Sequence, residues 1–114
     1  MEPRTILVRD GNLTRCINIK DLIHVQCEGY LCTFTTQGGV QLSHSKSLSF
    51  YTKLLQPYHF TRISRSTLIN VEHVSAIKSG IKNRKSVLMS NGDEFPIAFR
   101  RWKELKDTIK IHNI

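Results

Sequence analysis

Four turn dipeptides that contain glycine separate short β-prone runs over residues 1–99, and they limit what this chain can fold into. They are Asp10-Gly11, Glu28-Gly29, Gly38-Gly39 and Asn91-Gly92. Asn-Gly and Asp-Gly pairs between apolar runs favour tight hairpins, because both central residues of such a turn must tolerate positive φ. Strands that recur at this spacing predict an antiparallel sandwich or a barrel-like sheet.

Two segments have helical periodicity instead. Residues 47–57 predict a helix with Ser47 as its cap, Pro57 as its stop and one apolar face formed by Leu48, Tyr51 and Leu55. Residues 100–114 predict a second helix, whose apolar face consists of Trp102, Leu105 and Ile109. Arg100 and Arg101 are expected at the positive end of its macrodipole without a capping residue before them, which is unfavourable unless an anion binds there.

The chain is strongly basic, with 17 Lys and Arg residues, nine Asp and Glu residues and a net charge of +8. Residues 58–114 carry a net charge of +6, and residues 1–57 carry +2. This balance favours an acidic partner such as nucleic acid, although a solvated basic face would have the same composition. No apolar run approaches the roughly 20 residues of a membrane span, and the N-terminal residues lack a signal-peptide core, so we expect a cytoplasmic protein.

Residue patterns that support catalysis or metal binding are sparse. The sequence has no phosphate-binding glycine loop and no nucleophile elbow, and its five histidines lack metal-ligand spacing. The three cysteines, Cys16, Cys27 and Cys32, include no C-x-x-C pair. An odd count of this kind predicts a reducing compartment without a disulfide framework, with thiols that serve as inert packing. We therefore expect no enzyme activity, no cofactor and no metal.

The sequence FTRISRSTLIN, residues 60–70, combines apolar, hydroxyl and arginine side chains in an unusual way. Phe60 and Ile63 are expected to point the same way into apolar packing, and residues 64–66 to form a break between two strands. A loop that exposes Arg65 between two hydroxyls suits a DNA duplex. The guanidinium can bond guanine O6 and N7, while serine hydroxyls reach phosphate.

Neighbouring polar residues have other expected roles. Arg62 is expected to be structural or to contact phosphate, and Asn70 to fix the backbone of a turn. The basic loop of Lys82, Arg84 and Lys85 is interpreted mainly as a solvated face.

Three segments, taken in chain order, resemble the LytTR DNA-binding domains of bacterial response regulators. They are INIKDLIHVQCEGYLCTFTT (17–36), FTRISRSTLINVEHVSAI (60–77) and SNGDEFPIAFRRWKELK (90–106). The resemblance covers about residues 4–111. It implies a mostly β fold, an elongated antiparallel β-sandwich of short strands with two short flanking helices, that forms a single domain over residues 1–114.

The resemblance also implies sequence-specific double-stranded DNA binding for transcriptional regulation, through loops inserted into the major groove. On this basis Arg65 and Arg100 are expected to contact bases. Backbone or auxiliary contacts are expected from Tyr30, Arg62, Ser64, Ser66, Arg101 and Lys103. Ser64 stands where many members carry histidine, and Ala98-Phe99 where Ser-Arg is common.

Members of this family usually bind repeated sites in pairs, so the resemblance implies weak self-association on DNA. It also implies a receiver or sensor domain elsewhere in a longer protein, unless the chain is a stand-alone member. Two alternatives remain open. An RNA or single-strand binding module would need exposed aromatics, whereas the runs around Tyr30, Phe34 and Phe60 predict half-burial. A protein-interaction module built on strand edges would bind independently of salt.

Overall fold

A computed structural model of the protein describes residues 5–43 and 46–109. In chain order the α-helices and strands are β1 (Thr5–Asp10), β2 (Leu13–Asn18), β3 (Leu22–Glu28), β4 (Leu31–Thr36), β5 (Gly39–Ser43), α1 (Leu48–Leu55), β6 (Phe60–Arg62), β7 (Thr67–Asn70), β8 (Val74–Ser79), β9 (Lys85–Met89), β10 (Glu94–Ile97) and α2 (Trp102–Ile109). Short 3-10 turns connect several of them. Strands dominate, as the sequence predicts.

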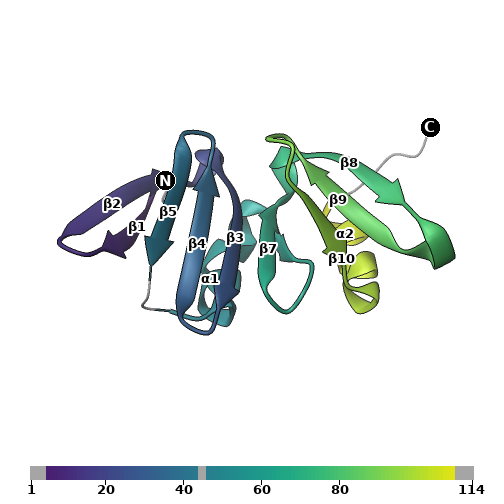
Figure 1. The fold of residues 1–114 in the computed structure, drawn as a ribbon, viewed down its shortest axis with the longest axis horizontal. Helices are drawn as coiled ribbons and strands as arrows, with labels where there is room; N and C mark the ends of the chain where they lie inside the picture. The colour runs from purple at the N-terminus through teal and green to yellow at the C-terminus, as the bar shows by residue number, and fades with distance from the viewer. Residues whose placement is uncertain (1–4, 44–45, 110–114) are drawn as a thin grey trace.

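All strand pairs of the described chain are antiparallel, and they form three sheets (Figure 1). A hairpin of β1 and β2 lies at one end, and a sheet of order β10-β9-β8 lies at the other. Between them lies a five-stranded sheet of order β5-β4-β3-β7-β6. The molecule measures 46 × 32 × 24 Å, so the predicted elongated shape and mostly β class are confirmed.

The predicted hairpin turns are confirmed at all four dipeptides. Gly11 joins β1 to β2 with φ of 61°, and Gly29 joins β3 to β4 with φ of 60°. The second turn has two central residues, Gly29 and Tyr30, with glycine at the first of them, which is the pattern of a type II′ turn. Any side chain larger than hydrogen at Gly29 would be strained in this backbone conformation.

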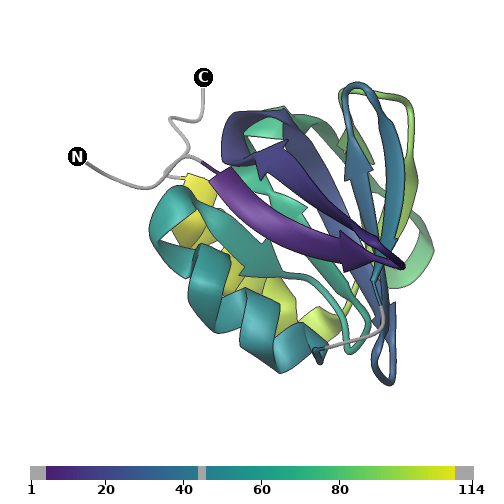
Figure 2. The same cartoon turned by 90° about the vertical axis from the view of Figure 1, so that its left-hand side faces the viewer.

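Both helices lie on the same flank of the strands, as Figure 2 shows. Helix α1 begins at the predicted cap, where the Phe50 N–H donates to Ser47 Oγ at 3.4 Å, and it buries Leu48, Tyr51 and Leu55. Helix α2 buries Leu105 fully, and it packs Trp102 and Ile109 against the apolar cluster that contains Leu105. It begins at Trp102 because residues 99–101 form a 3-10 turn. The predicted continuation past Ile109 lies outside the described residues.

The buried apolar side chains form two clusters rather than one. The first lies among β1, β2, the five-stranded sheet and α1, and it contains Phe34, Phe60 and Leu68. The second joins the three-stranded sheet and α2 to β7, and it contains Ile63 and Ile69. The expectation that Phe60 and Ile63 point the same way is therefore wrong. Alternate residues of a strand face opposite sides, and the backbone leaves the strand after Arg62.

Two polar side chains tie distant segments together in the interior. Buried Asn70 donates from Nδ2 to the Leu22 carbonyl at 2.9 Å, and its Oδ1 accepts from the Glu72 N–H at 3.0 Å. Its predicted role in fixing a turn is confirmed. Buried His24 on β3 lies 2.8 Å from Asp93, in the turn between β9 and β10, through Nε2 and Oδ2. This hydrogen bond, followed by one from Asn91, holds the pKa of Asp93 below its ordinary value.

Neither helix in the described part of the chain has the length and apolar character that crossing a membrane requires.

Candidate nucleic-acid interface

Three segments that are far apart in the sequence meet along one edge of the molecule. They are the turn between β3 and β4, the loop of residues 63–66 between β6 and β7, and residues 98–101 before α2. Figure 1 shows all three along its lower edge. Two backbone hydrogen bonds join them: the Cys27 N–H donates to the Ser66 carbonyl at 2.9 Å, and the Ala98 N–H donates to the Ile63 carbonyl at 2.8 Å. The 63–66 loop is thus anchored on both sides.

The 63–66 loop is also closed on itself. The Ile63 N–H donates to the Thr67 carbonyl at 3.0 Å, and the Ser66 N–H donates to Ser64 Oγ at 3.3 Å. A serine side chain that bonds a nearby backbone N–H stabilises a tight turn. The expected break between the two strands is confirmed, and its backbone is held in one conformation by these bonds.

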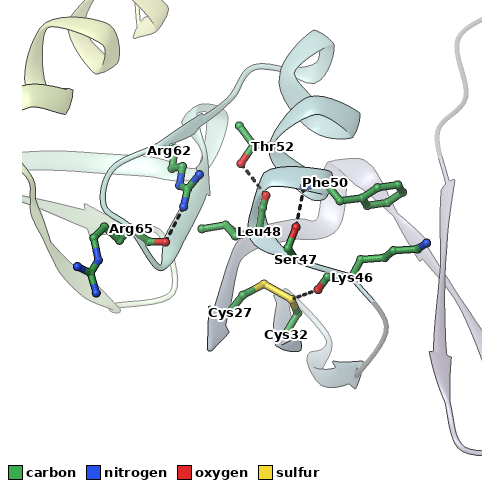
Figure 3. The surroundings of a disulfide bond; sticks show 9 residues. All are labelled: Cys27, Cys32, Lys46, Ser47, Leu48, Phe50, Thr52, Arg62 and Arg65. Carbon is green, nitrogen blue, oxygen red and sulfur yellow. Dashed lines mark hydrogen bonds between the residues drawn. A yellow bond between two sulfur atoms is a disulfide. The ribbon is translucent and has the colours of Figure 1, made fainter. Parts of the chain in front are cut away.

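Arg62 supports this loop from inside. Its Nε donates to the Ser64 carbonyl at 3.1 Å. Its NH2 nitrogen donates to the Arg65 carbonyl at 2.7 Å, a bond drawn in Figure 3. Its NH1 nitrogen lies 3.4 Å from Ser49 Oγ on α1. Burial, followed by the positive charge of nearby Arg101, lowers the pKa of Arg62. All three guanidinium nitrogens therefore face protein oxygens. Of the two roles expected for Arg62, structural support and phosphate contact, the geometry favours structural support.

Arg65 is exposed, and its side chain extends away from the carbonyl that Arg62 holds (Figure 3). Ser66 is exposed beside it, and Ser64 is half-buried. Within residues 5–43 and 46–109, the Arg65 guanidinium has no acidic partner. A fixed backbone carrying a free guanidinium leaves the whole planar fork available to an external acceptor.

The segment before α2 presents a second cationic group. Arg100 is exposed and, among the described residues, its side chain has no ion pair. Arg101 is half-buried and reaches Glu104 at 3.5 Å, so the first turn of α2 supplies an acid that offsets part of the unfavourable charge expected there. Lys103 is exposed on the first turn of α2. Phe99 is 89% exposed next to Arg100.

Tyr30 lies at the tip of the β3–β4 turn and is 67% exposed. The expectation of half-burial is wrong for this residue, because it belongs to the turn and not to the following strand. Phe34 and Phe60 are buried more completely than expected. The edge therefore combines two free arginines with an exposed tyrosine and several hydroxyls.

Cys27 and Cys32 form a disulfide at the base of this turn (Figure 3). The interpretation of these cysteines as inert packing thiols is wrong, and sequence analysis did not identify the bond. A signal was present, because a two-residue turn at Gly29 and Tyr30 places residues 27 and 32 directly opposite each other. Cys16 is free and exposed. The described residues contain no cluster of three or more His, Cys, Asp and Glu side chains suited to a metal ion.

The chain is similar to known proteins in both sequence and fold. The family model of the LytTr DNA-binding domain matches residues 13–110. A sensory transduction protein LytT of Bacillus cereus is 26% identical over 95 residues, covering 83% of this chain and 38% of that protein. A transcriptional regulatory protein LytR of Staphylococcus aureus is 26% identical over 101 residues, covering 82% of this chain and 41% of that protein. The chain thus spans about two fifths of the length of these relatives.

A solved structure has the same fold. The LytTr DNA-binding domain of a methyl-accepting/DNA response regulator from Bacillus cereus superposes with a TM-score of 0.82 at 16% identity, covering 96% of this chain and all of that one. The family match over most of the chain, together with this fold, confirms the resemblance carried by residues 17–36, 60–77 and 90–106. The chain belongs to the family of LytTR DNA-binding domains.

Proposed function

We propose that this protein binds double-stranded DNA in a sequence-specific manner to regulate transcription, with its loops entering the major groove. Arg65 and Arg100 contact bases in this proposal. Arg62 positions the 63–66 loop, and the remaining contacts to the backbone come from Tyr30, Ser64, Ser66, Arg101 and Lys103. The domain carries out no catalysis.

One observation carries the proposal. Arg65 and Arg100 are exposed and, among the described residues, have no acidic partner, and their segments are joined by the backbone bond from Ala98 to Ile63. A base-reading group must be presented with a fixed position, since a bidentate contact to guanine depends on the orientation of the guanidinium plane. Loops held by long-range backbone bonds meet this requirement better than freely moving side chains on a surface. The excess of positive charge adds a sequence-independent attraction to phosphate.

The remaining partners in this proposal are those that the family resemblance implies. We expect residues 1–114 to act as one domain that binds repeated sites in pairs, with weak self-association on DNA. A receiver or sensor domain elsewhere in a longer cytoplasmic protein is supported by the relatives, since the chain matches only about two fifths of their length.

The test is selection from a pool of random duplexes, followed by measurement of affinity for the enriched site at several salt concentrations. We expect one site to enrich and its affinity to fall steeply with salt. The double variant Arg65→Ala/Arg100→Ala should lose discrimination between this site and random sequence, because each base contact contributes about 1–3 kcal/mol.

A charge-matched control separates base readout from net charge. The double variant Arg9→Ala/Lys53→Ala removes two exposed cations from β1 and α1, away from the proposed interface. It should weaken binding to all sequences slightly and keep the preference. Equal loss of preference in both double variants, or no enriched site at all, would contradict the proposal.

Single-strand binding is a second candidate, favoured by one observation. Tyr30 and Phe99 are exposed aromatics on the same edge, and stacking on such rings contributes about 1–3 kcal/mol per base. Competition with an unlabelled single strand of the selected sequence decides between the two. Displacement by the single strand at lower concentration than by the duplex would favour this second function.

A further inference from the structure

The disulfide lies between two of the proposed DNA-contacting segments. Cys27 and Cys32 are directly paired across the β3–β4 hairpin, with Glu28 and Leu31 as the next pair and Tyr30 at the tip. The backbone N–H of Cys27 donates to the Ser66 carbonyl at 2.9 Å. The disulfide therefore cross-links the base of the β3–β4 turn that carries Tyr30. One of its two cysteines, Cys27, is also the residue that anchors the 63–66 loop.

The second sulfur faces the start of α1. Cys32 Sγ lies 3.1 Å from the Lys46 carbonyl, immediately before the cap residue Ser47 (Figure 3). A disulfide sulfur carries no hydrogen, so this contact becomes a hydrogen bond only when Cys32 is a thiol. The Lys46 carbonyl is thus placed to accept a hydrogen bond from Cys32 in the reduced form. In the oxidised form the Cys32 sulfur is bonded to Cys27 instead.

The two sulfurs differ in access. Cys32 is fully buried, and Cys27, although also buried in the same apolar cluster, is 7% exposed. An external thiolate must approach the sulfur that it attacks. Of the two cysteines only Cys27 has any exposed surface, so a small thiolate is expected to attack there.

We propose that Cys27 and Cys32 form a reversible thiol–disulfide site, attacked at Cys27, whose oxidation state sets the affinity of the interface for DNA. In reduction, the thiolate of a small thiol bonds to Cys27 Sγ, and the sulfur–sulfur bond breaks toward Cys32, which takes up a proton. A second small thiolate then attacks the small-molecule sulfur of the mixed disulfide. The two small thiols leave together as a disulfide, and the released Cys27 thiolate takes up a proton. Two electrons pass from the small thiols to the protein, and a small-molecule disulfide reverses the process.

The effect on DNA affinity rests on the proposed function. In the oxidised form the cross-link restricts the turn that carries Tyr30, so less conformational freedom is lost when this turn is ordered against DNA. The strand ladder between β3 and β4 remains in the reduced form, which therefore stays folded. We expect reduction to weaken binding of the selected duplex by roughly 3- to 10-fold, the range set by ordering one or two side chains.

The chemistry is tested by mass spectrometry on folded protein in a Cys16→Ser background, which removes the free exposed cysteine. Glutathione disulfide should block alkylation of both remaining cysteines, and dithiothreitol should restore it. In the single variants, Cys32→Ser should accept one glutathione at Cys27, while Cys27→Ser should leave Cys32 unmodified. Failure of the reduced pair to oxidise, or faster modification of Cys32 than of Cys27, would overturn the proposal.

The coupling is tested by DNA affinity of the same oxidised and reduced samples. The double variant Cys27→Ser/Cys32→Ser should bind equally under both conditions, whereas the protein with both cysteines should bind more tightly when oxidised. Equal affinity of its two forms would overturn the coupling and leave the proposed function intact. Absence of sequence-specific binding in both forms would instead remove the proposed function, and the coupling with it.

Discussion

Two loops of this protein present exposed positive charge, yet they are built differently. The 63–66 loop is bonded to β3 through Cys27, to the residue after β10 through Ala98 and to its own arginine, Arg62. The basic loop of residues 81–84 is closed by its own backbone, with the Gly80 N–H donating to the Arg84 carbonyl at 2.7 Å and the Arg84 N–H to the Ile81 carbonyl at 3.2 Å. Lys82 and Arg84 extend from it into solvent.

The two loops show that carrying positive charge and holding that charge in a fixed position are separate properties. Both loops attract a polyanion, because phosphate responds to net charge over a distance set by the salt concentration. Orientation of a guanidinium against a base edge needs a backbone that other elements hold in place. Sequence discrimination should therefore depend on the 63–66 loop, while the 81–84 loop contributes affinity without preference.

The largest effect should come from removing the support of the first loop. Arg62→Ala leaves the carbonyls of Ser64 and Arg65 without their donors, so we expect a loss of about 1–3 kcal/mol in unfolding free energy. Affinity for the selected site should fall at least tenfold, because Arg65 is no longer held in place. Urea denaturation and fluorescence anisotropy measure the two quantities.

Arg62→Lys is the matched control, since it keeps the charge but cannot bridge three acceptors with a planar fork. It should retain most of the defect. Full recovery of affinity in the lysine variant would show that the charge of Arg62, and not its geometry, supports the loop.

Arg65→Ala should affect recognition alone. The side chain is exposed and has no partner within the described residues, so unfolding free energy should change by less than about 0.5 kcal/mol. Affinity for the selected site should fall by about 1–3 kcal/mol, and discrimination should be lost at one base pair. Binding to a panel of single-base variants measures this, and a uniform loss across the panel would place Arg65 on phosphate instead.

Arg84→Ala tests the second loop with the same change of residue. Affinity should fall by about 1 kcal/mol or less for every sequence, and the slope of log affinity against log salt should decrease by about one. Salt titrations of the selected and random duplexes provide the measurement. A larger loss on the selected site than on random DNA would mean that the 81–84 loop also reads sequence.

The smallest effect should come from the bond between His24 and Asp93, which joins β3 to the turn between β9 and β10. The lowered pKa of Asp93 means that its bond to His24 stabilises the fold above the ordinary pKa of the carboxyl and is lost as pH falls through the lowered value. Asp93→Asn should therefore unfold at a lower temperature than wild type near pH 6. The difference should shrink below about pH 4, as the wild-type carboxyl becomes protonated. Thermal denaturation across this range measures it, and a constant difference would assign the effect to another interaction.

Local features were predictable from the order of residues. The turn at Gly29, the cap at Ser47 and the apolar face of α1 each depend on backbone preferences and spacings within a few positions. The break at residues 64–66 was visible because the alternation of the strand fails there. Arg65 and Arg100 were identified by combining this break with the family resemblance, and their exposure in the structure is compatible with the proposed contacts.

What tertiary structure decided was the relation between distant segments. Whether Arg62 meets a phosphate or two carbonyls depends on where the chain turns after it. The assignment of Phe60 and Ile63 to separate clusters depends on which sheets lie on either side of β6 and β7. The backbone bond from Cys27 to Ser66 needs the β3–β4 hairpin and the 63–66 loop to be brought together by the fold, whereas the disulfide to Cys32 lies within the hairpin itself. Such contacts follow from packing over the whole chain, and local sequence preferences do not encode them.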